Sequence, residues 1–494
     1  MFFFDLINKS FGQIEYNLYP KDIENIEITG IACDSRNVQN GFLFAAIPGY
    51  KNDGVKFIKD AVIRGAVAII TEADDEACTS ISSIAYVIQV KDARKALAFA
   101  VKQFFSCIDS TLDLFGVTGT NGKTSTTHYI SWVFNALGIK TGVIGTLGGI
   151  SPAGTVSTER TTPDILKLFE IFSEYAKNDI KAAAMEVSSH ALEMNRVYGL
   201  KFKFGIFTNL TEDHLDFHKN MDAYKKAKEK LFLQCECGII NIDDPYGKQI
   251  AQSLPCRLVT YSAKEPNADY FASGIINMPG KTEFVLTVKG DDKYTVKLVT
   301  PGLFSVYNAL AAIALCIEYG LAPCDVCNII SEMPPVPGRF ESIKNHSGIN
   351  IILDYAHTPD GIRNVLNTAK EFTLGKIISV FGCGGDRDRA KRSQMGKISG
   401  SIADYTVITS DNPRSENEIS IAYETAAELD DMQCIYNIII NREKAIEHAI
   451  KCARSGDTVI IMGKGHETYQ QIGQIKYPFS DRDIITDTIA RLRL

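Results

Sequence analysis

Short apolar segments alternate with helical patterns, and this alternation restricts the possible fold more than any other feature of the sequence. Near the N-terminus, strand-like segments at 42–47 and 66–70 flank a helical stretch at 54–65. Strand-like segments recur in the last third of the chain, at 349–355, 376–382, 405–410 and 458–463. Strands that alternate with helices are typical of parallel sheets covered by helices on both faces. The sequence therefore predicts an α/β protein.

The length and one proline-rich segment predict three domains. The chain has 494 residues, and domains average about 150 residues. The segment PPVPG at 334–338 has the composition of a linker. Another strand-like segment, 112–117, marks the start of the middle part. The expected domains are 1–110, 111–337 and 338–494.

Composition narrows the class of protein. The net charge of −7 argues against a nucleic-acid-binding protein, which would usually carry a basic face. The 12 cysteines show no disulfide or zinc spacing, since the CxC of Cys235 and Cys237 has no second pair. The first ten residues lack the basic and apolar regions of a signal peptide, and no apolar run approaches the roughly 18 residues of a membrane span. We expect a cytoplasmic protein with reduced thiols and no membrane insertion.

The strongest local signal is the segment GTNGKT at 119–124, which lies between the strand-like 112–117 and the helical 124–138. Backbone N–H groups of such a loop, together with the helix N-terminus, bind phosphates. Lys123 would reach the phosphates, and the hydroxyl of Thr124 would reach Mg²⁺. Val117 occupies a position where the usual phosphate loop has glycine, so the loop is a tighter variant. The alternative is an ordinary glycine-rich turn.

The tighter loop resembles the ATP loop of the Mur ligases and of folylpolyglutamate synthases. Further segments resemble motifs of that family in the family's order: MEVSSHAL (185–192), TNLTEDHLDFH (208–218), YNALAA (307–312), PGRFE (337–341) and LDYAHTPDG (353–361). The resemblance covers nearly the whole chain. It implies a three-domain Mur ligase architecture, with a substrate-binding first domain, a central P-loop ATPase-type domain and a Rossmann-like C-terminal domain that binds an amino acid.

Other segments resemble one branch of the family, the enzymes that add the third residue of the cell-wall peptide. These segments are DSR (34–36), GCGGDRDRAKR (382–392), DNPR (411–414) and GKGHETYQ (463–470). The resemblance implies ATP-dependent addition of meso-diaminopimelate to UDP-N-acetylmuramoyl-L-alanyl-D-glutamate through an acyl phosphate, in peptidoglycan biosynthesis. Ligation with L-lysine or LL-diaminopimelate remains an alternative. A folylpolyglutamate synthase and a non-catalytic nucleotide-binding protein are more distant ones.

The resemblance also implies the catalytic residues, namely Lys123, Glu186, His214 and Lys228. Thr124, Glu186, His214 and Lys228, the last as a carbamate, would hold Mg²⁺. The helix pattern around Lys228 is informative, because positions 224, 228, 231 and 232 share one helix face and the other three are Tyr, Leu and Phe. A partly buried lysine loses proton affinity, and the neutral amine can capture CO₂. The alternative is a surface lysine.

The family motifs assign three further groups of residues. ATP would be bound by Gly119, Thr120, Asn121, Gly122, Lys123, Thr124, Ser125, Asn308, Arg339 and Asp354. The UDP-muramoyl dipeptide would be bound by Cys33, Ser35, Tyr50, Lys51, Asn52, Thr161, Thr162, Ser188 and Arg196. Diaminopimelate would be bound by Arg387, Asp411, Asn412, Pro413, Arg414, Gly463 and Glu467.

The residues themselves support an amino-acid site in the third domain. The segments 382–389, 411–414 and 463–467 each follow a strand-like segment. Ligands of open α/β sheets bind outside the carboxyl ends of the strands. Two guanidiniums and one carboxylate there suit a zwitterionic amino acid with an extra acidic group. The alternative is ordinary loop charge. We expect a monomer, although no sequence feature fixes the oligomeric state.

Overall fold

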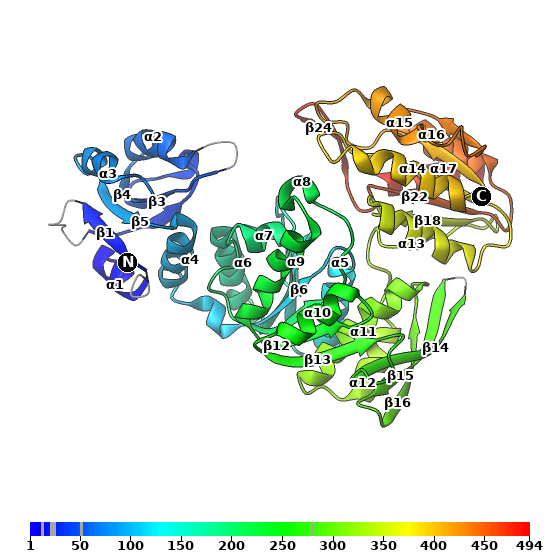
Figure 1. Cartoon of the computed structure of the whole chain (residues 1–494), viewed down its shortest axis with the longest axis horizontal. Coiled ribbons are helices and arrows are strands. Elements are labelled where there is room, and N and C mark those ends of the chain that lie inside the picture. The colour runs from blue at the N-terminus through cyan, green and yellow to red at the C-terminus, as the bar shows by residue number, and fades with distance from the viewer. Residues whose placement is uncertain (11–13, 20–25, 50–52, 279) are drawn as a thin grey trace.

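The computed structural model describes residues 1–10, 14–19, 26–49, 53–278 and 280–494. These residues build three large sheets that follow one another along an arc-shaped molecule (Figure 1). In the described part of the chain, no helix combines the length and the apolar character needed to cross a bilayer.

The first sheet has the order β1-β5-β4-β3-β2 and is parallel except for β1, which pairs antiparallel with β5. Alternate residues of β3 explain its two covered faces, because Leu43 and Ala45 pack with α1 and α4 whereas Phe44 and Ala46 pack with α2. Its elements are α1 (Phe3–Ser10), β1 (Tyr16–Tyr19), β2 (Gly30–Ala32), η1 (Ser35–Asn37), β3 (Phe42–Ala46), η2 (Gly54–Phe57), α2 (Ile58–Ile63), β4 (Ala66–Thr71), α3 (Asp75–Ile81), β5 (Tyr86–Val90) and α4 (Ala93–Phe104).

The second sheet has eleven strands in the order β16-β15-β14-β13-β12-β11-β6-β10-β7-β8-β9. Its strands are β6 (Asp113–Thr118), β7 (Thr141–Gly145), β8 (Gly148–Ser151), β9 (Gly154–Val156), β10 (Ala182–Glu186), β11 (Phe202–Phe207), β12 (Cys235–Asn241), β13 (Arg257–Ser262), β14 (Tyr270–Met278), β15 (Lys281–Val288) and β16 (Asp292–Leu298). Its helices are η3 (Ile108–Thr111), α5 (Lys123–Ala136), α6 (Ile165–Lys177), α7 (Ser189–Glu193), α8 (Leu215–His218), α9 (Met221–Glu229), η4 (Lys230–Gln234), α10 (Pro245–Ser253), α11 (Leu303–Glu318) and α12 (Pro323–Ser331).

Helices α5 and α11 cover one face of this sheet with apolar side chains such as Ile130 and Ala312. The other face shares a continuous core with the first sheet, because α4 and α6 contribute to the same cluster through Leu97 and Phe169. The two N-terminal parts of the chain are therefore packed against each other through these helices.

The third sheet has the order β17-β18-β22-β19-β20-β21 and is parallel except for β17. Helix α13 packs on one face through Ile362, and α16 packs on the other through Ile446. The elements are β17 (Glu341–Ile343), β18 (Asn350–Asp354), α13 (Pro359–Lys370), β19 (Ile377–Phe381), α14 (Ala390–Ile402), β20 (Tyr405–Ile408), α15 (Glu418–Ala426), β21 (Tyr436–Ile438), α16 (Arg442–Cys452), β22 (Thr458–Met462), β23 (Tyr469–Ile472), β24 (Ile475–Pro478) and α17 (Asp481–Leu492).

The predicted α/β class is confirmed, and the strands expected from apolar segments are present. The sheets differ from the prediction at some of their edges, where β1, β17 and the outer strands of the second sheet pair antiparallel. The second sheet gains the hairpin strands β14 to β16 at one edge and β7 to β9 at the other. Antiparallel strands need only a short turn, so these additions form without the helical crossovers on which the prediction relied.

Candidate active site

A cleft of about 930 Å³ opens between the second and third sheets and gathers most of the predicted functional residues. The predicted residues that line it are Thr120, Asn121, Gly122, Lys123, Thr124, Ser125, Thr161, Glu186, Ser188, His214, Asn308, Arg339, Asp354, Arg387, Asp411, Asn412, Arg414, Gly463 and Glu467. Six other predicted residues do not line the cleft: Gly119, Thr162, Arg196, Lys228, Pro413 and Ser35. Ser35 belongs to the first domain, and the other five belong to the second and third. Cys33 is also outside the lining, and Tyr50, Lys51 and Asn52 fall outside the described residues.

The phosphate loop connects the central strand β6 to α5, as the sequence predicted. Gly119 and Gly122 both have positive φ, at 150° and 90°. A Cβ atom at Gly119 would lie 1.8 Å from Thr208 Oγ1, and one at Gly122 would lie 2.3 Å from Asn308 Oδ1. Only glycine fits such close approaches, so the loop is pressed against two neighbouring segments. This packing fixes the position of the helix N-terminus that would face a phosphate.

Lys123 folds back over this loop. Its ammonium donates to the carbonyl oxygens of Gly119 at 2.9 Å and Thr120 at 2.8 Å. Burial lowers the pKa of Lys123, although the carboxylate of Glu186 acts in the opposite direction. Its two hydrogen-bond acceptors are neutral and it forms no ion pair among the described residues, so its positive charge is available to a phosphate.

Glu186 ends β10 and is almost fully buried, with 1% of its surface exposed. Its carboxylate accepts hydrogen bonds from Thr146, from the backbone N–H at 2.9 Å and from the hydroxyl at 3.1 Å. Thr146 was not predicted, and nothing in its sequence context points to this contact. The pair holds a buried carboxylate at the floor of the cleft.

Lys228 is buried on α9, with 1% of its surface exposed, in agreement with the predicted helix face. Its ammonium lies 4.5 Å from the centre of the Tyr224 ring, and it forms no ion pair among the described residues. Burial, followed by the charge of Lys123, lowers the pKa of Lys228 well below the usual lysine value. The neutral amine is therefore populated to a much larger extent than in a surface lysine.

His214 lies in the left-handed region, with φ of 54°, which is uncommon for a non-glycine residue and is a local strain typical of functional sites. Burial lowers the pKa of His214 to about 3, so its imidazole is neutral near pH 7. The ring packs against His190, with centroids 4.7 Å apart. A neutral imidazole is the form that can bind a metal ion.

Asp213 was not predicted, yet it joins the two sides of the cleft. Its carboxylate forms an ion pair with Lys391 of α14 and lies 3.4 Å from His214 Nε2. Burial alone would raise the pKa of Asp213, but the neighbouring His214 and Lys391 lower it below the usual value. The segment EDH predicts a role for the histidine. It does not predict the ion pair of Asp213 with Lys391, because that pair forms only when the second and third sheets pack together.

The residues predicted to contact the muramoyl peptide cluster beside Glu186. The hydroxyl of Thr162 donates to the Glu186 carbonyl at 2.8 Å and contacts the hydroxyl of Ser188 at 3.2 Å. Arg196 donates to the Thr162 carbonyl at 3.3 Å and forms an ion pair with Asp164 at 3.1 Å. This cluster continues the cleft toward the first domain, where Ser35 is buried at the start of η1.

Arg339 crosses from the linker to the phosphate loop. Its guanidinium donates to Thr124 Oγ1 at 2.9 Å and lies 4.4 Å from the centre of the Tyr355 ring. Asp354 does not pair with it directly; its carboxylate accepts from the backbone N–H groups of Phe340 at 2.6 Å and Ala356 at 2.6 Å. Asp354 thus holds the segment that carries Arg339.

Three loops bring charged side chains to the opposite wall, after β19, β20 and β22. Arg387 and Arg414 line the cleft, and Arg414 donates to the Gly385 carbonyl at 2.7 Å. Glu467 also lines the cleft, and its carboxylate accepts from Lys464 at 2.8 Å and from Asn412 at 2.9 Å. The sequence analysis missed Lys464, a fully buried lysine in GKGHE.

A phosphate loop that faces two guanidiniums across a cleft suits an enzyme that uses a nucleoside triphosphate and an anionic substrate. Family models match in chain order: "Mur ligase family, catalytic domain" at 27–105, "Mur ligase middle domain" at 117–316 and "Mur ligase, glutamate ligase domain" at 338–465. The chain belongs to the Mur ligase family and is an ATP-dependent ligase. The family predicted from the motifs is therefore confirmed.

Relatives in one branch of the family are similar over nearly the whole chain. The UDP-N-acetylmuramoyl-L-alanyl-D-glutamate–2,6-diaminopimelate ligase of Alkaliphilus metalliredigens is 45% identical over 93% of both chains. The enzyme of the same name from Clostridioides difficile is 42% identical over 95% of this chain and 96% of its own. A solved structure with that name is 30% identical, with a TM-score of 0.68, over 96% of this chain and 98% of that one.

The folylpolyglutamate synthase of Mycobacterium tuberculosis shares the fold, with a TM-score of 0.62 over 80% of this chain and 94% of that one. Its sequence identity is 16%, so the likeness extends to the fold alone.

Proposed function

We propose that this chain adds meso-diaminopimelate to UDP-N-acetylmuramoyl-L-alanyl-D-glutamate in peptidoglycan biosynthesis. The observation that carries the proposal is the cleft itself, in which the phosphate loop with Lys123 faces the loops that carry Arg387 and Arg414. Relatives of that name, similar over nearly the whole chain, support it. The motifs and the geometry thus favour the same substrates.

The reaction needs activation because a carboxylate does not acylate an amine unaided. The γ-carboxylate of D-glutamate attacks the terminal phosphorus of ATP, which gives an acyl phosphate and ADP. The ammonium of the amino acid loses one proton, and the resulting amine attacks the acyl carbon. Inorganic phosphate leaves, and the nitrogen gives up a second proton to solvent as the amide forms. Lys123 is placed to stabilise the moving phosphoryl charge, which is the main demand of such a transfer. Arg387 and Arg414 hold the incoming amino acid by its carboxylates.

Mg²⁺ fits the donors of the cleft in the way that this ion usually binds. The described residues contain no cluster of three His, Cys, Asp or Glu side chains that could enclose a metal. Mg²⁺ typically uses one or two carboxylates together with substrate phosphates and water. Glu186, Thr124 and the neutral imidazole of His214 would hold it, and it would neutralise phosphate charge. The buried carboxylate of Glu186 next to the phosphate loop supports this role.

We also propose that Lys228 carries a carbamate. A buried amine with a lowered pKa and no ion-pair partner among the described residues is the form that reacts with CO₂. The amine attacks the carbon of CO₂ and loses a proton, so the modified side chain presents two oxygens with a negative charge. That charge would complement Lys123 and Mg²⁺ in the cleft.

The decisive experiment measures phosphate release with purified protein, ATP and Mg²⁺. Release should require both the UDP-muramoyl dipeptide and meso-diaminopimelate, and the tripeptide product should appear in equal amount. The amino-acid panel includes L-lysine, LL-diaminopimelate and, with a folate acceptor, L-glutamate. A preference for another amino acid, or release without the dipeptide, would contradict the proposal.

A further inference from the structure

Two arginines, Arg387 and Arg414, face the cleft from neighbouring loops of the third domain. Arg387 donates to the Asp386 carbonyl at 3.1 Å, and Arg414 donates to the Gly385 carbonyl at 2.7 Å. Neither guanidinium has an ion-pair partner among the described residues. Burial, followed by the charge of Arg387, lowers the pKa of Arg414. The two positive charges repel each other, so other contacts must hold their loops.

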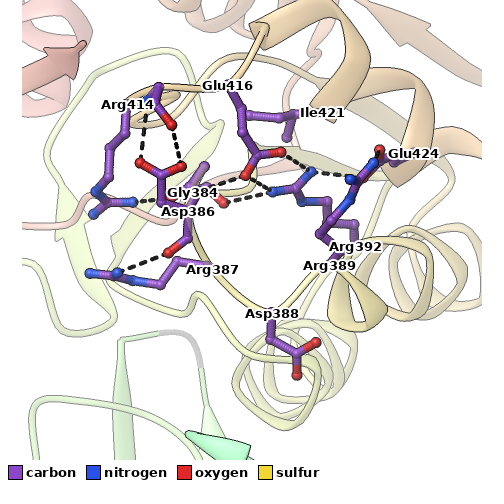
Figure 2. A network of polar contacts seen from close by, with 12 residues as sticks. Gly384, Asp386, Arg387, Asp388, Arg389, Arg392, Arg414, Glu416, Ile421 and Glu424 are labelled. Carbon is purple, nitrogen blue, oxygen red and sulfur yellow. Dashed lines mark hydrogen bonds and ion pairs between the residues drawn. The ribbon is translucent and has the colours of Figure 1, made fainter. Parts of the chain in front are cut away.

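The loop after β19 is bonded to the loop after β20. The N–H of Gly385 donates to the Asn412 carbonyl at 2.9 Å, and the hydroxyl of Ser415 donates to the Asp386 carboxylate. The N–H of Asp386 donates to Glu416 Oε1 at 2.6 Å. Figure 2 shows that Glu416 lies between the Asp386 backbone of the first loop and the guanidinium of Arg392. The spacing of the two cleft arginines therefore depends on where Glu416 is held.

Glu416 is held by Arg392, a buried arginine of α14 that has 1% of its surface exposed. The guanidinium forms two parallel bonds to Glu416, at 2.8 and 2.7 Å, and a third to Glu424 of α15 at 2.7 Å. It also contacts the Gly384 carbonyl at 3.4 Å, in the loop that carries Arg387 (Figure 2). Arg392 thus connects two helices and both arginine loops at one point.

We propose that Arg392 is a positioning residue that sets the spacing of Arg387 and Arg414 and thereby the selectivity for an amino acid with a distal carboxylate. The proposal rests on the function proposed above. Two glutamates neutralise Arg392, so it does not bind the substrate itself. It acts by keeping Glu416 away from the cleft arginines, which stay unpaired and available to carboxylates. Loss of this restraint would let repulsion spread the two loops apart.

The test is Arg392→Lys, which keeps the charge but cannot form two parallel bonds to Glu416 while also reaching Glu424. A displacement of about 1 Å in a binding group can cost up to a hundredfold in rate. We expect the KM for meso-diaminopimelate to rise about tenfold or more, with kcat and the KM values for ATP and the UDP-muramoyl dipeptide nearly unchanged. The preference for diaminopimelate over L-lysine should fall in parallel.

The matched control is Arg389→Lys, because Arg389 pairs with the same Glu424 but is exposed and has no contact with Glu416 among the described residues. Its kinetics should match the wild type. If Arg392→Lys does not fold, Glu416→Gln tests the same link, since the amide keeps the volume but loses the charge. An unchanged KM for diaminopimelate in a folded variant overturns the proposal. An equal rise in all three KM values also overturns it, because that indicates general destabilisation. Wild-type enzyme that does not use diaminopimelate would instead refute the proposed function.

Discussion

The two walls of the cleft use charge in opposite ways. On the central side, the buried Lys228 and the half-buried Lys123 have no ion-pair partners among the described residues, and desolvation lowers both of their pKa values. On the C-terminal wall, Arg392 is neutralised by two glutamates and Lys464 by Glu467. An unpaired positive charge can stabilise the phosphoryl group during its transfer. Side chains that hold one another by ion pairs can instead keep a substrate-binding site in one shape. Changes on the first wall should therefore act on turnover, and changes on the second on selectivity.

The largest expected effect is that of Lys123→Ala, which removes the charge nearest the phosphate loop. Loss of a cation where negative charge is redistributed should lower kcat by several powers of ten, about 10³-fold or more. Phosphate release at saturating ATP measures it. Lys140→Ala, at an exposed lysine of the same domain, is the control and should retain wild-type turnover. A kcat near the wild-type value in the Lys123 variant would show that the unpaired charge on the central side does not determine turnover.

Lys228→Ala should lower kcat by about a hundredfold or more, because the carbamate oxygens and their charge are lost. Short carboxylic acids that enter the space should restore part of the activity. In the wild type, activity should fall when CO₂ is removed and return with bicarbonate at constant pH. The control is Lys226→Ala, at an exposed lysine of the same helix. Equal activity with and without CO₂, or a high-resolution map of the active, metal-loaded enzyme with an unmodified Lys228, would contradict carbamoylation.

The third prediction tests the C-terminal wall. Arg414→Ala should lower kcat/KM for meso-diaminopimelate by about a hundredfold or more, because the distal carboxylate loses its charged partner. The value for L-lysine, which has no such carboxylate, should change little. The comparison is of kcat/KM for both amino acids, with the exposed Arg454→Ala as control. An equal loss for both amino acids would mean that Arg414 is not the selector.

Much of this arrangement could be predicted because it is local in sequence. The phosphate loop was expected between a strand and a helix, and Lys228 was expected on the apolar face of its helix. The convergence of the three C-terminal loops followed from a general rule, since the carboxyl ends of parallel strands meet at one edge. In each case the residues that decide the structure lie within a few positions of one another.

The remaining features depend on contacts between distant segments. Lys391 meets Asp213 only because the third sheet docks beside the second, and no local pattern marks either residue as a partner. Lys464 was overlooked because a buried lysine is rare without a partner, and its partner Glu467 had been assigned to the substrate. Charge pairing of this kind is set by the folded geometry and is invisible to spacing along the chain.

The smallest expected effect concerns the junction between the two walls, where His466 packs against Tyr355 with ring centroids 5.0 Å apart. Burial, followed by the charge of Arg339, lowers the pKa of His466 to about 4, and its Nδ1 has no partner. An unfolded histidine has a pKa of about 6.5. Between these pH values the unfolded chain binds a proton that the folded protein does not. The contribution of neutral His466 to the free energy of unfolding is therefore complete above pH 6.5.

That contribution should be lost as the pH falls from about 6.5 toward 4, with a slope of at most about 1.4 kcal/mol per pH unit for one proton. His466→Gln removes the titrating group, so its urea midpoint should fall less than that of the wild type between pH 7 and pH 5. His346→Gln, at an exposed histidine of the same domain, controls for the substitution itself and should follow the wild type. Parallel curves for wild type and His466→Gln would show that the junction tolerates a protonated His466, and that the boundary between the two walls is open to solvent.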